Sequence, residues 1–458
     1  MSRKYFGTDG IRGKANVHPM TADMVMKIAM ATAATMHDSR HENHQNRVII
    51  GKDTRLSGYM LEQAMAAGFI AMGMEVLIVG PIPTPGIAML TRSLRADIGV
   101  MISASHNHYQ DNGIKLFGHN GFKLDDDVED KIEAALENGL ESKLSPPDKL
   151  GKASRLDDAL GRYAEFLKAS LPRWQVLDGL KVVIDCANGA GYKIAPQLLW
   201  ELEADVIPIG TAPNGKNIND GYGATSPENL RNAVIDNKAH IGVALDGDAD
   251  RVIMVDEQGD IIDGDQIMAA LADHWSETGS LKNKTVVATV MSNLGLEKYL
   301  ESKGIELKRT KVGDRYVVEQ MQKEGHNLGG EQSGHIIMTD YGTTGDGLMA
   351  ALQAMSILKT SARPASIALK RFDPFPQCLE NIQFNPGSPN PLENERIMNC
   401  IEKINDTLGE KGRIVVRASG TEPVIRVMGE AENETLLKNA VNTVSAEIRN
   451  FNSLKEAS

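Results

Sequence analysis

Two polar segments carry residue types that could handle phosphate. Ser105 lies in Met101-Ile-Ser-Ala-Ser-His-Asn107, directly after an apolar run, and Asp246-Gly-Asp-Ala-Asp-Arg251 places carboxylates at alternate positions after another. A serine hydroxyl needs a base or a strong electrophile to react, and a metal-polarised phosphoryl group is such an electrophile. Carboxylates provide the oxygen ligands that Mg²⁺ prefers, with positions left for phosphate oxygens. We therefore expect a phosphate-carrying Ser105 and a metal ion on Asp246, Asp248 and Asp250.

A calcium loop is the main alternative for the carboxylate segment. Asp246, Asp248, Asp250 and Glu257 coincide with positions 1, 3, 5 and 12 of an EF-hand. Arg251 stands where that loop needs glycine, and the flanking residues are typical of strands, so we reject this interpretation. Arg251 is better suited to pair with a phosphate or to orient the carboxylates.

Other polar loops add groups that could bind a sugar or move a proton. Asp111-Asn-Gly-Ile-Lys115 brings a cation next to the serine segment. Gly329-Gly-Glu-Gln-Ser-Gly-His335 combines a carboxylate, an amide, a hydroxyl and an imidazole with glycines that let backbone approach a ligand. His335 or Lys115 could move a proton. The charges of Thr310-Lys-Val-Gly-Asp-Arg315 predict a solvated turn.

A phosphate nest is predicted near the C-terminus. Arg417-Ala-Ser-Gly-Thr-Glu-Pro423 places a guanidinium, two hydroxyls and free backbone N–H groups around a glycine. An ordinary hairpin loop is the alternative. The chain has no GxxxxGK[ST] motif, so nucleotide binding of that kind is unsupported.

Three segments predict the same βαβ plan. Apolar runs at 48–51, 182–185 and 286–289 each lead through a polar loop and an amphipathic helix to a second run, at 76–79, 206–209 and 305–307. Such units build mostly parallel sheets whose ligand loops follow the strand C-termini. Residues 371–458 predict two strands, at 413–417 and 423–428, between two helices. The expected fold is thus three similar α/β domains of mixed, mostly parallel sheet and a smaller α+β domain around a central cleft.

Domain boundaries follow from breaks in these patterns. Residues 141–153 are polar and rich in proline, 255–260 form a turn, and 363–376 interrupt a helix. We therefore predict domains at 1–152, 153–255, 256–370 and 371–458.

Composition limits the partners and the compartment. The chain has 458 residues, a formal net charge of −12 and 5% aromatic residues, which argues against nucleic-acid binding. Its three cysteines show no CxxC spacing, so neither a disulfide framework nor a zinc site is expected. The N-terminal residues lack an apolar signal core, and the most apolar stretch, 64–90, is interrupted by prolines and a glutamate. We expect a cytoplasmic protein without a membrane partner.

In combination the motifs resemble the α-D-phosphohexomutase superfamily over essentially the whole chain. The shared segments are Thr8-Asp-Gly-Ile-Arg12, the Ser-His-Asn loop, Asp-Gly-Asp-Ala-Asp-Arg, Gly-Glu-Gln-Ser-Gly-His and Arg-Ala-Ser-Gly-Thr-Glu-Pro, in the family's order. The glutamine at position 332 is similar to the residue found in the bacterial branch that acts on glucosamine phosphates, whereas mannose and glucose mutases usually have methionine there.

The resemblance implies roles for individual residues. Ser105 would be a phosphoserine, and its phosphate would join Asp246, Asp248 and Asp250 in binding one Mg²⁺ per chain. Lys115 and His335 would be the candidates for general acid and base, with Arg12 and Arg251 also in the catalytic set. The substrate-binding residues would be His106, Asn107, Glu331, Ser333, Arg417, Ser419, Gly420, Thr421 and Arg426.

The implied reaction interconverts glucosamine 6-phosphate and glucosamine 1-phosphate. Ser105 would give its phosphate to the sugar, and the 1,6-bisphosphate, which also serves as primer, would reorient and return the other phosphate. This reaction would supply UDP-N-acetylglucosamine for cell-wall synthesis. One departure is His108, which stands where the family usually has proline, so the serine loop would be less rigid.

Several alternatives stay open at this point. The chain could be a phosphomannomutase or phosphoglucomutase of the same superfamily. An aspartyl-phosphate phosphohydrolase would use Asp246 as nucleophile and Asp248 as acid, and a non-catalytic phosphosugar-binding module would have lost the serine or the triad. The sequence leaves open whether the chain forms a homodimer and whether a kinase or self-phosphorylation first modifies Ser105.

Overall fold

The chain separates into two compact units. The computed structural model describes residues 3–38, 45–137, 139–384, 390–418 and 424–456. The first unit comprises Met1–Thr289 and Ile305–Arg371, and the second comprises Val290–Gly304 and Phe372–Ser458. Three sheets lie in the first unit and one in the second. The boundaries drawn from the sequence at 152, 255 and 370 stay predictions.

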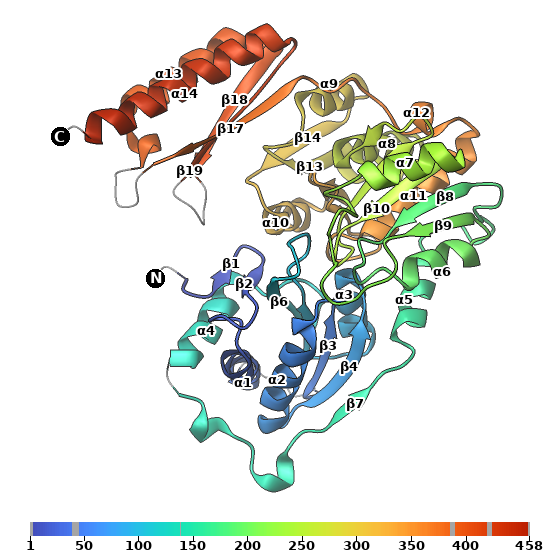
Figure 1. The fold of residues 1–458 in the computed structure, drawn as a ribbon, viewed down its shortest axis with the longest axis vertical. Helices are drawn as coiled ribbons and strands as arrows, with labels where there is room; N and C mark the ends of the chain where they lie inside the picture. Colours follow the sequence, from blue (N-terminus) through green and yellow to red (C-terminus); the bar gives the residue numbers. More distant parts are fainter. Residues whose placement is uncertain (1–2, 39–44, 138, 385–389, 419–423, 457–458) are drawn as a thin grey trace. The chain divides into compact units, whose positions relative to one another are not determined.

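The first sheet has seven strands in the order β1-β2-β6-β5-β3-β4-β7 (Figure 1). The strands are β1 (Phe6–Gly7), β2 (Gly10–Lys14), β3 (Arg47–Lys52), β4 (Glu75–Pro81), β5 (Ile98–Ile102), β6 (Asp111–Gly118) and β7 (Ala153–Arg155). The helices are α1 (Ala22–Asp38), α2 (Ser57–Ala71), α3 (Thr84–Ser93), α4 (Asp126–Glu137), and the short η1 (Glu141–Lys143) and η2 (Pro147–Lys149). β7 follows the expected linker and pairs in parallel with β4, so it extends this first sheet.

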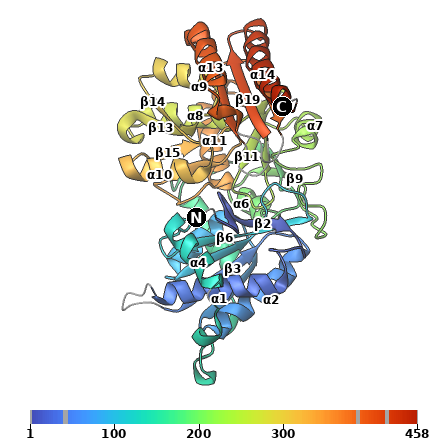
Figure 2. The same ribbon diagram turned by 90° about the vertical axis from the view of Figure 1, so that its left-hand side faces the viewer.

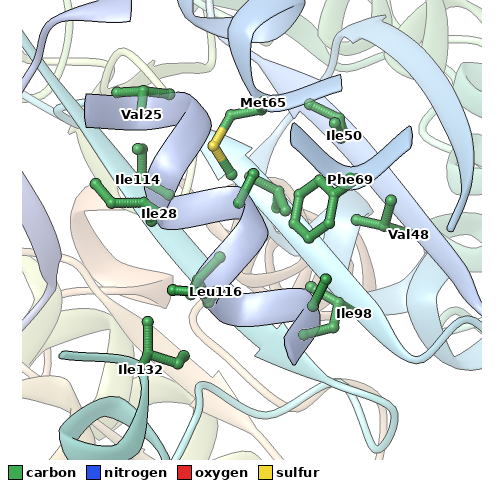
Figure 3. Packing of buried hydrophobic residues seen from close by; sticks show 14 of the residues in the cluster. Val25, Ile28, Val48, Ile50, Met65, Phe69, Ile98, Ile114, Leu116 and Ile132 are labelled. Atoms are coloured by element: carbon green, nitrogen blue, oxygen red, sulfur yellow. The ribbon is translucent and has the colours of Figure 1, made fainter. Parts of the chain in front are cut away.

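Alternate side chains of β3 pack into two different hydrophobic clusters, one on each face of the sheet. Val48 and Ile50 belong to the cluster that packs against α1 and α2, which Figure 3 shows from close by. Ile49 belongs to another cluster, together with Ile87 of α3. Because both faces of the strand are buried, its sequence is an uninterrupted apolar run without the alternation of a half-exposed strand.

The second and third sheets repeat the mixed plan. The second, in the order β12-β11-β10-β8-β9, contains β8 (Lys181–Asp185), β9 (Asp205–Ile209), β10 (Ile241–Leu245), β11 (Val252–Asp256) and β12 (Ile261–Ile262). The third, in the order β14-β13-β15-β16, contains β13 (Thr285–Thr289), β14 (Glu306–Thr310), β15 (Leu328–Gly330) and β16 (Ile336–Met338). Their helices are α5 (Ala159–Lys168), α6 (Ile194–Glu201), α7 (Glu228–Asn237), α8 (Gly264–Glu277), η3 (Lys282–Lys284), α10 (Asp314–Glu324), α11 (Gly347–Ser361) and α12 (Ala365–Ala368).

The three expected βαβ units are confirmed. β3 pairs in parallel with β4, β8 with β9, and β13 with β14. Antiparallel strands such as β6, β11 and β16 complete each sheet. The first unit is therefore built from three mixed α/β sheets, as predicted.

The second unit contains a three-stranded antiparallel sheet in the order β17-β19-β18. Its elements are α9 (Leu294–Ser302), β17 (Gln377–Gln383), η4 (Pro391–Glu393), α13 (Glu395–Leu408), η5 (Gly409–Lys411), β18 (Gly412–Ala418), β19 (Val424–Ala431) and α14 (Glu434–Glu456). Figure 2 shows α13 and α14 side by side, and both helices contact this sheet. The sequence predicted only two strands here: β17 was missed because it is polar and mostly exposed, so it lacks an apolar period.

Each α/β sheet ends one of its strands at a polar loop. β5 leads to Ser105, β10 to Asp246 and β15 to the segment 331–335. The carboxyl ends of strands with parallel neighbours are where α/β folds bind ligands. Within the described part of the chain, no helix combines the length and the apolar character that crossing a bilayer requires.

The α1 core offers a direct test of this packing. Ile28 is fully buried, whereas Met26 on the same helix is 36% exposed. We expect Ile28→Ala to lower the free energy of unfolding by about 2–5 kcal/mol because it leaves a cavity. Met26→Ala should change it by only about 0.5 kcal/mol. Urea unfolding followed by circular dichroism measures both variants, and equal losses would contradict the assigned face of α1.

Candidate active site

Ser105 lies at the end of β5 and contacts the carboxylate loop directly. Its side chain is buried, and its Oγ donates a hydrogen bond of 2.6 Å to Oδ2 of Asp246. Gly247 makes this approach possible, because a Cβ at that position would lie 2.5 Å from the carbonyl oxygen of Ser105. The structure thus brings together the two segments that the sequence singled out.

Asp246, Asp248 and Asp250 converge after β10. Each offers a carboxylate oxygen, these oxygens all lie within 4.8 Å of one another, and all three residues are buried. Burial and the carboxylates of Asp250 and Asp248 raise the pKa of Asp246 to about 8. Three negative charges at this spacing are unfavourable without a nearby cation.

Lys115 of β6 provides one such cation from within the chain. Its Nζ donates to Oδ2 of Asp248 at 2.9 Å and to Oδ2 of Asp250 at 3.0 Å. Burial alone would lower the pKa of Lys115, but Asp248, Asp250 and Asp9 outweigh burial and hold that pKa well above its usual range. Lys115 is therefore a protonated group at neutral pH.

The remaining oxygens of the triad fit a metal ion. Oδ1 of Asp248 and Oδ1 of Asp250 are buried and accept no hydrogen bond of 3.5 Å or less from the described residues. The nearest charged donors to Oδ1 of Asp250 are Nδ1 of His335 at 3.6 Å and Nε of Arg251 at 3.9 Å. Lys115 occupies the opposite oxygen of each carboxylate, so these two atoms stay available as ligands. A small all-oxygen donor set of this kind suits a hard divalent cation such as Mg²⁺.

Thr84, at the start of α3, holds the loop that carries Asp246, Asp248 and Asp250. Its Oγ1 donates to Oδ2 of Asp248 at 2.5 Å, and its backbone N–H donates to the carbonyl of Asp248 at 2.9 Å. This contact was not apparent from the sequence, because threonine before an apolar helix is typical of an ordinary helix start.

His335 lies beside the same carboxylates, in the loop between β15 and β16. Its Nδ1 is 3.6 Å from Oδ1 of Asp250, and its Nε2 is 3.4 Å from Oδ2 of Asp314. Burial lowers the pKa of His335, but Asp250 and Asp314 outweigh burial and raise it. In the same loop, Glu331 accepts from the backbone N–H of Gly313 at 3.3 Å, and Ser333 is exposed.

The predicted solvated turn at 310–315 was wrong. Asp314 accepts a 2.5 Å hydrogen bond from Nζ of Lys123, and Arg315 donates to Glu129 at 2.9 Å and also pairs with Asp126. These partners are 186 to 191 residues away in the chain, so a local pattern could not reveal them. The turn joins the third α/β sheet's loops to the first.

Asp9 and Lys123 complete the charge network around Lys115. Lys123 pairs with Asp9, and Oδ2 of Asp9 lies 3.4 Å from Nζ of Lys115. Successive ion pairs therefore form a closed ring through Lys115, Asp9, Lys123, Asp314, His335 and Asp250. The sequence marked Lys115, His335 and Asp250 but gave no separate role to the other three.

Two arginines also lie near the serine and the triad. Arg12 pairs with Asp9 and donates to the carbonyl of Ala104 at 3.4 Å. Arg251 donates its backbone N–H to Oδ1 of Asp246 at 3.2 Å, and its Nε lies 3.9 Å from Oδ1 of Asp250. The backbone of Arg251, rather than its guanidinium, makes the hydrogen bond to the triad, so the expected role of its side chain stays a prediction.

The two residues after Ser105 lie within the same turn. Nδ1 of His106 is 3.5 Å from Oγ of Ser105, and burial together with Arg251 and Arg12 lowers the pKa of His106 to about 4. Asn107 donates to Oδ2 of Asp111 at 3.0 Å. His108, the departure from the family pattern, is exposed, and its carbonyl accepts from the N–H of Asp111 at 3.1 Å.

Two of the predicted phosphate-binding residues are described within the second unit. Arg417 of β18 and Arg426 of β19 are cross-strand partners, so their side chains share one face of the sheet. Ser419, Gly420 and Thr421 lie outside the described residues.

Comparison with known families assigns every α/β sheet. Models of the phosphoglucomutase/phosphomannomutase family match this chain with alpha/beta/alpha domain I at residues 3–143, domain II at 162–259 and domain III at 263–375. The C-terminal domain of the same family matches residues 379–446.

Solved structures share the fold. A phosphoglucomutase/phosphomannomutase family protein from Burkholderia thailandensis has a TM-score of 0.80 at 23% identity, over 97% of each chain. The N-acetylphosphoglucosamine mutase of Aspergillus fumigatus has a TM-score of 0.66 at 18% identity, over 98% of this chain and 96% of its own.

Curated relatives are much more similar in sequence. The phosphoglucosamine mutase of Parvibaculum lavamentivorans is 56% identical, over 98% of this chain and 99% of its own length. That of Rhizobium etli strain CIAT 652 is 55% identical, over 99% of this chain and 100% of its own length. With all four domain types matched and identity at this level over nearly the full length, the chain belongs to the phosphoglucomutase/phosphomannomutase family and, within it, to the phosphoglucosamine mutases.

Proposed function

We propose that the chain interconverts glucosamine 6-phosphate and glucosamine 1-phosphate with Ser105 as the phosphate carrier. The observation that carries this proposal is the 2.6 Å contact between Oγ of Ser105 and Oδ2 of Asp246, at the edge of a buried carboxylate triad. A serine in that position can carry a phosphoryl group next to a metal ion. The supply of UDP-N-acetylglucosamine for cell-wall synthesis is the cellular role that this reaction would serve.

The reaction balances as two phosphoryl transfers. In the first, the bond between phosphorus and Oγ of Ser105 breaks, a bond to the sugar hydroxyl oxygen forms, and that hydroxyl loses its proton to a base as Oγ gains one. The product is glucosamine 1,6-bisphosphate, which is also the primer that we assign. After the bisphosphate reorients, its other phosphoryl group returns to Ser105 by the reverse exchange.

Asp246, Asp248, Asp250 and an oxygen of the phosphoserine would hold one Mg²⁺. When bound, the ion would neutralise charge that develops on the transferring phosphoryl group. Lys115, Arg12 and Arg251 would add fixed positive charge in a buried setting, where such interactions are strong.

Lys115 and His335 are the proposed proton-transfer groups. Lys115 is protonated at neutral pH and would be the donor to an oxygen that leaves phosphorus. His335 is fixed between Asp250 and Asp314, which orients its ring. Because both residues border the triad, either can exchange a proton as the serine and sugar oxygens alternate as leaving groups.

Substrate contacts would come from three loops. His106 and Asn107 follow the carrier, and Glu331 and Ser333 would read the sugar. Arg417 and Arg426 would bind the phosphate that is not reacting, together with Ser419, Gly420 and Thr421. Arg417 and Arg426 are cross-strand partners on one face of the sheet, so both guanidinium groups could contact the same phosphate.

The cellular setting follows from simpler observations. Cys186, Cys378 and Cys400 are free, which fits the reducing cytoplasm that we propose as the location. The homodimer and the first phosphorylation of Ser105, by a kinase or by the chain itself, stay predictions.

Replacing the carrier tests the chemistry. We expect Ser105→Ala to form no phosphoenzyme from the bisphosphate and to lose turnover by about three orders of magnitude or more. Binding of glucosamine 6-phosphate, measured by calorimetry, should persist. Ser302→Ala, which removes an exposed hydroxyl, is the control and should match the unmodified chain. Phosphate that hydroxylamine releases, and that survives Ser105→Ala, would contradict the proposal and indicate an acyl phosphate on Asp246.

Substrate preference tests the sugar assignment. In a coupled assay with Mg²⁺ and a bisphosphate primer, we expect kcat/KM for glucosamine 6-phosphate to exceed the values for glucose and mannose 6-phosphates. A strong preference for the glucose or mannose compound would assign the chain to the corresponding mutase reaction instead.

Metal binding tests the triad. Titration with Mn²⁺ as a Mg²⁺ analogue, followed by electron paramagnetic resonance, should show one site per chain. Asp248→Asn should weaken that site at least about tenfold because it removes a charged ligand. Asp260→Asn, an exposed carboxylate 54% accessible, is the control and should bind normally. Mg²⁺ should also raise the Tm of the unmodified chain but not of Asp248→Asn, and equal shifts would place the ion elsewhere.

A further inference from the structure

The turn that carries Ser105 is held by two side chains that come from different parts of the chain. Nη2 of Arg55 donates to the carbonyls of Ser105 and Asn107 at 3.1 and 2.5 Å. Nδ2 of Asn219 donates to the same two carbonyls, each at 2.9 Å. We call this arrangement the carbonyl clamp: Arg55 and Asn219 on the carbonyls of Ser105 and Asn107.

Ser105 needs such support because its backbone is in an unusual conformation. Its φ is 50°, in the left-handed region that residues other than glycine rarely adopt. A residue keeps that conformation when its surroundings over-determine it. Here the conformation points Oγ toward Asp246, so the clamp and the direction of the carrier hydroxyl depend on one another.

Arg55 is a fixed part of the first sheet. It is fully buried, pairs with Asp53, and donates its backbone N–H to Oδ1 of Asp53 at 2.9 Å. Asp53 in turn accepts from Oγ of Ser103 at 2.5 Å, and Ser103 accepts from the N–H of Ser105 at 3.0 Å. This side of the clamp belongs to the same domain as the carrier.

Asn219 comes instead from the second sheet, in the segment Asn217-Ile-Asn-Asp-Gly-Tyr-Gly223. The end of β8 holds this segment: Asp185 accepts from the N–H of Gly223 at 2.8 Å, and Ala187 accepts from the N–H of Asn219 at 2.9 Å. The backbone of Asn219 is also left-handed, at a φ of 57°, which asparagine tolerates better than most residues. Its amide is 114 residues from Ser105 in the chain.

The chemistry of the contact explains the residue type. Of the two ends of the Asn219 amide, only the NH₂ group can donate to carbonyl oxygens. The two carbonyls therefore fix the orientation of this amide. Aspartate has the same shape but would present an oxygen to each carbonyl and could donate to neither. The second domain thus positions the carrier turn through one side chain.

We propose that Asn219 is a positioning residue that keeps the Ser105 hydroxyl, and the phosphate it carries, aimed at the triad. This inference rests on the proposed role of Ser105 as phosphate carrier. Of the proposed substrate contacts, Glu331 and Ser333 lie in the loop between β15 and β16 and Arg417 lies in β18. His106 and Asn107 lie in the clamped turn itself. Because most of the proposed substrate contacts lie outside this turn, loss of the clamp should lower the transfer rate much more than it changes the KM for the sugar phosphate.

The experiment compares Asn219→Ala and Asn219→Asp with the matched control Asn229→Ala. Asn229 is exposed and donates its own amide to Gly221 of the same segment at 2.7 Å, without contact to the serine turn. Each variant is phosphorylated with the bisphosphate and mixed with glucosamine 6-phosphate in a single turnover. The transfer rate constant does not depend on how much protein is active, so it separates positioning from partial unfolding.

We expect both Asn219 variants to transfer phosphate about 100-fold more slowly, because small misplacements of a reacting group have effects of that size. Their steady-state KM should stay within about threefold of the unmodified chain, with the loss in kcat. Asn229→Ala should transfer at the unmodified rate.

Three results would overturn the inference. Transfer at the unmodified rate in both Asn219 variants shows that the clamp is not needed. Loss of folded structure in both, by circular dichroism, assigns Asn219 a structural role instead. If the unmodified chain forms no phosphoserine at all, both the proposed function and this inference fail. In the first two results the unmodified chain still forms phosphoserine, so they contradict only the inference.

Discussion

Three carboxylates that share one buried place need positive charge beside them, and much of this structure provides it. Asp246, Asp248 and Asp250 follow β10, and one carboxylate oxygen of each lies within 4.8 Å of the other two. All three residues are buried, so water screens their charges little. Lys115 neutralises one side, and the oxygens that it leaves free fit a divalent cation. Ser105 meets the triad at Asp246, so a phosphate on that serine would lie next to the same cation. The proposed carrier and the proposed metal site would thus form one arrangement.

The charged groups of this site come from all three α/β sheets. Lys115 is on the first sheet, the triad follows a strand of the second, and His335 and Asp314 belong to the third. Because their ion pairs form a closed ring, the charge around the carboxylate loop depends on the positions of the loops from the other two sheets. A chain with a net charge of −12 can bind an anionic sugar phosphate because these cations are concentrated at one site.

Sequence patterns singled out Ser105 and the three carboxylates, which the structure brings into contact, because each segment follows an apolar strand directly. The fold class was equally accessible, since each βαβ unit is local in the chain. Residues that act across sheets were not: Lys123 lies 191 residues from Asp314, and Asn219 lies 114 from Ser105. No local pattern distinguishes them from ordinary surface residues. Strand β17 was missed for a related reason, because its polar sequence is stabilised by pairing with β19 rather than by an apolar face.

Phosphorus NMR of the phosphorylated chain tests most directly whether Ser105 and the triad share one metal ion. The phosphoserine resonance is recorded before and after one equivalent of Mn²⁺, whose unpaired electrons broaden nearby nuclei. We expect the resonance to disappear with Mn²⁺ and to return when a chelator removes the ion. A sharp, unchanged phosphoserine resonance in protein that has bound one Mn²⁺ would contradict this expectation.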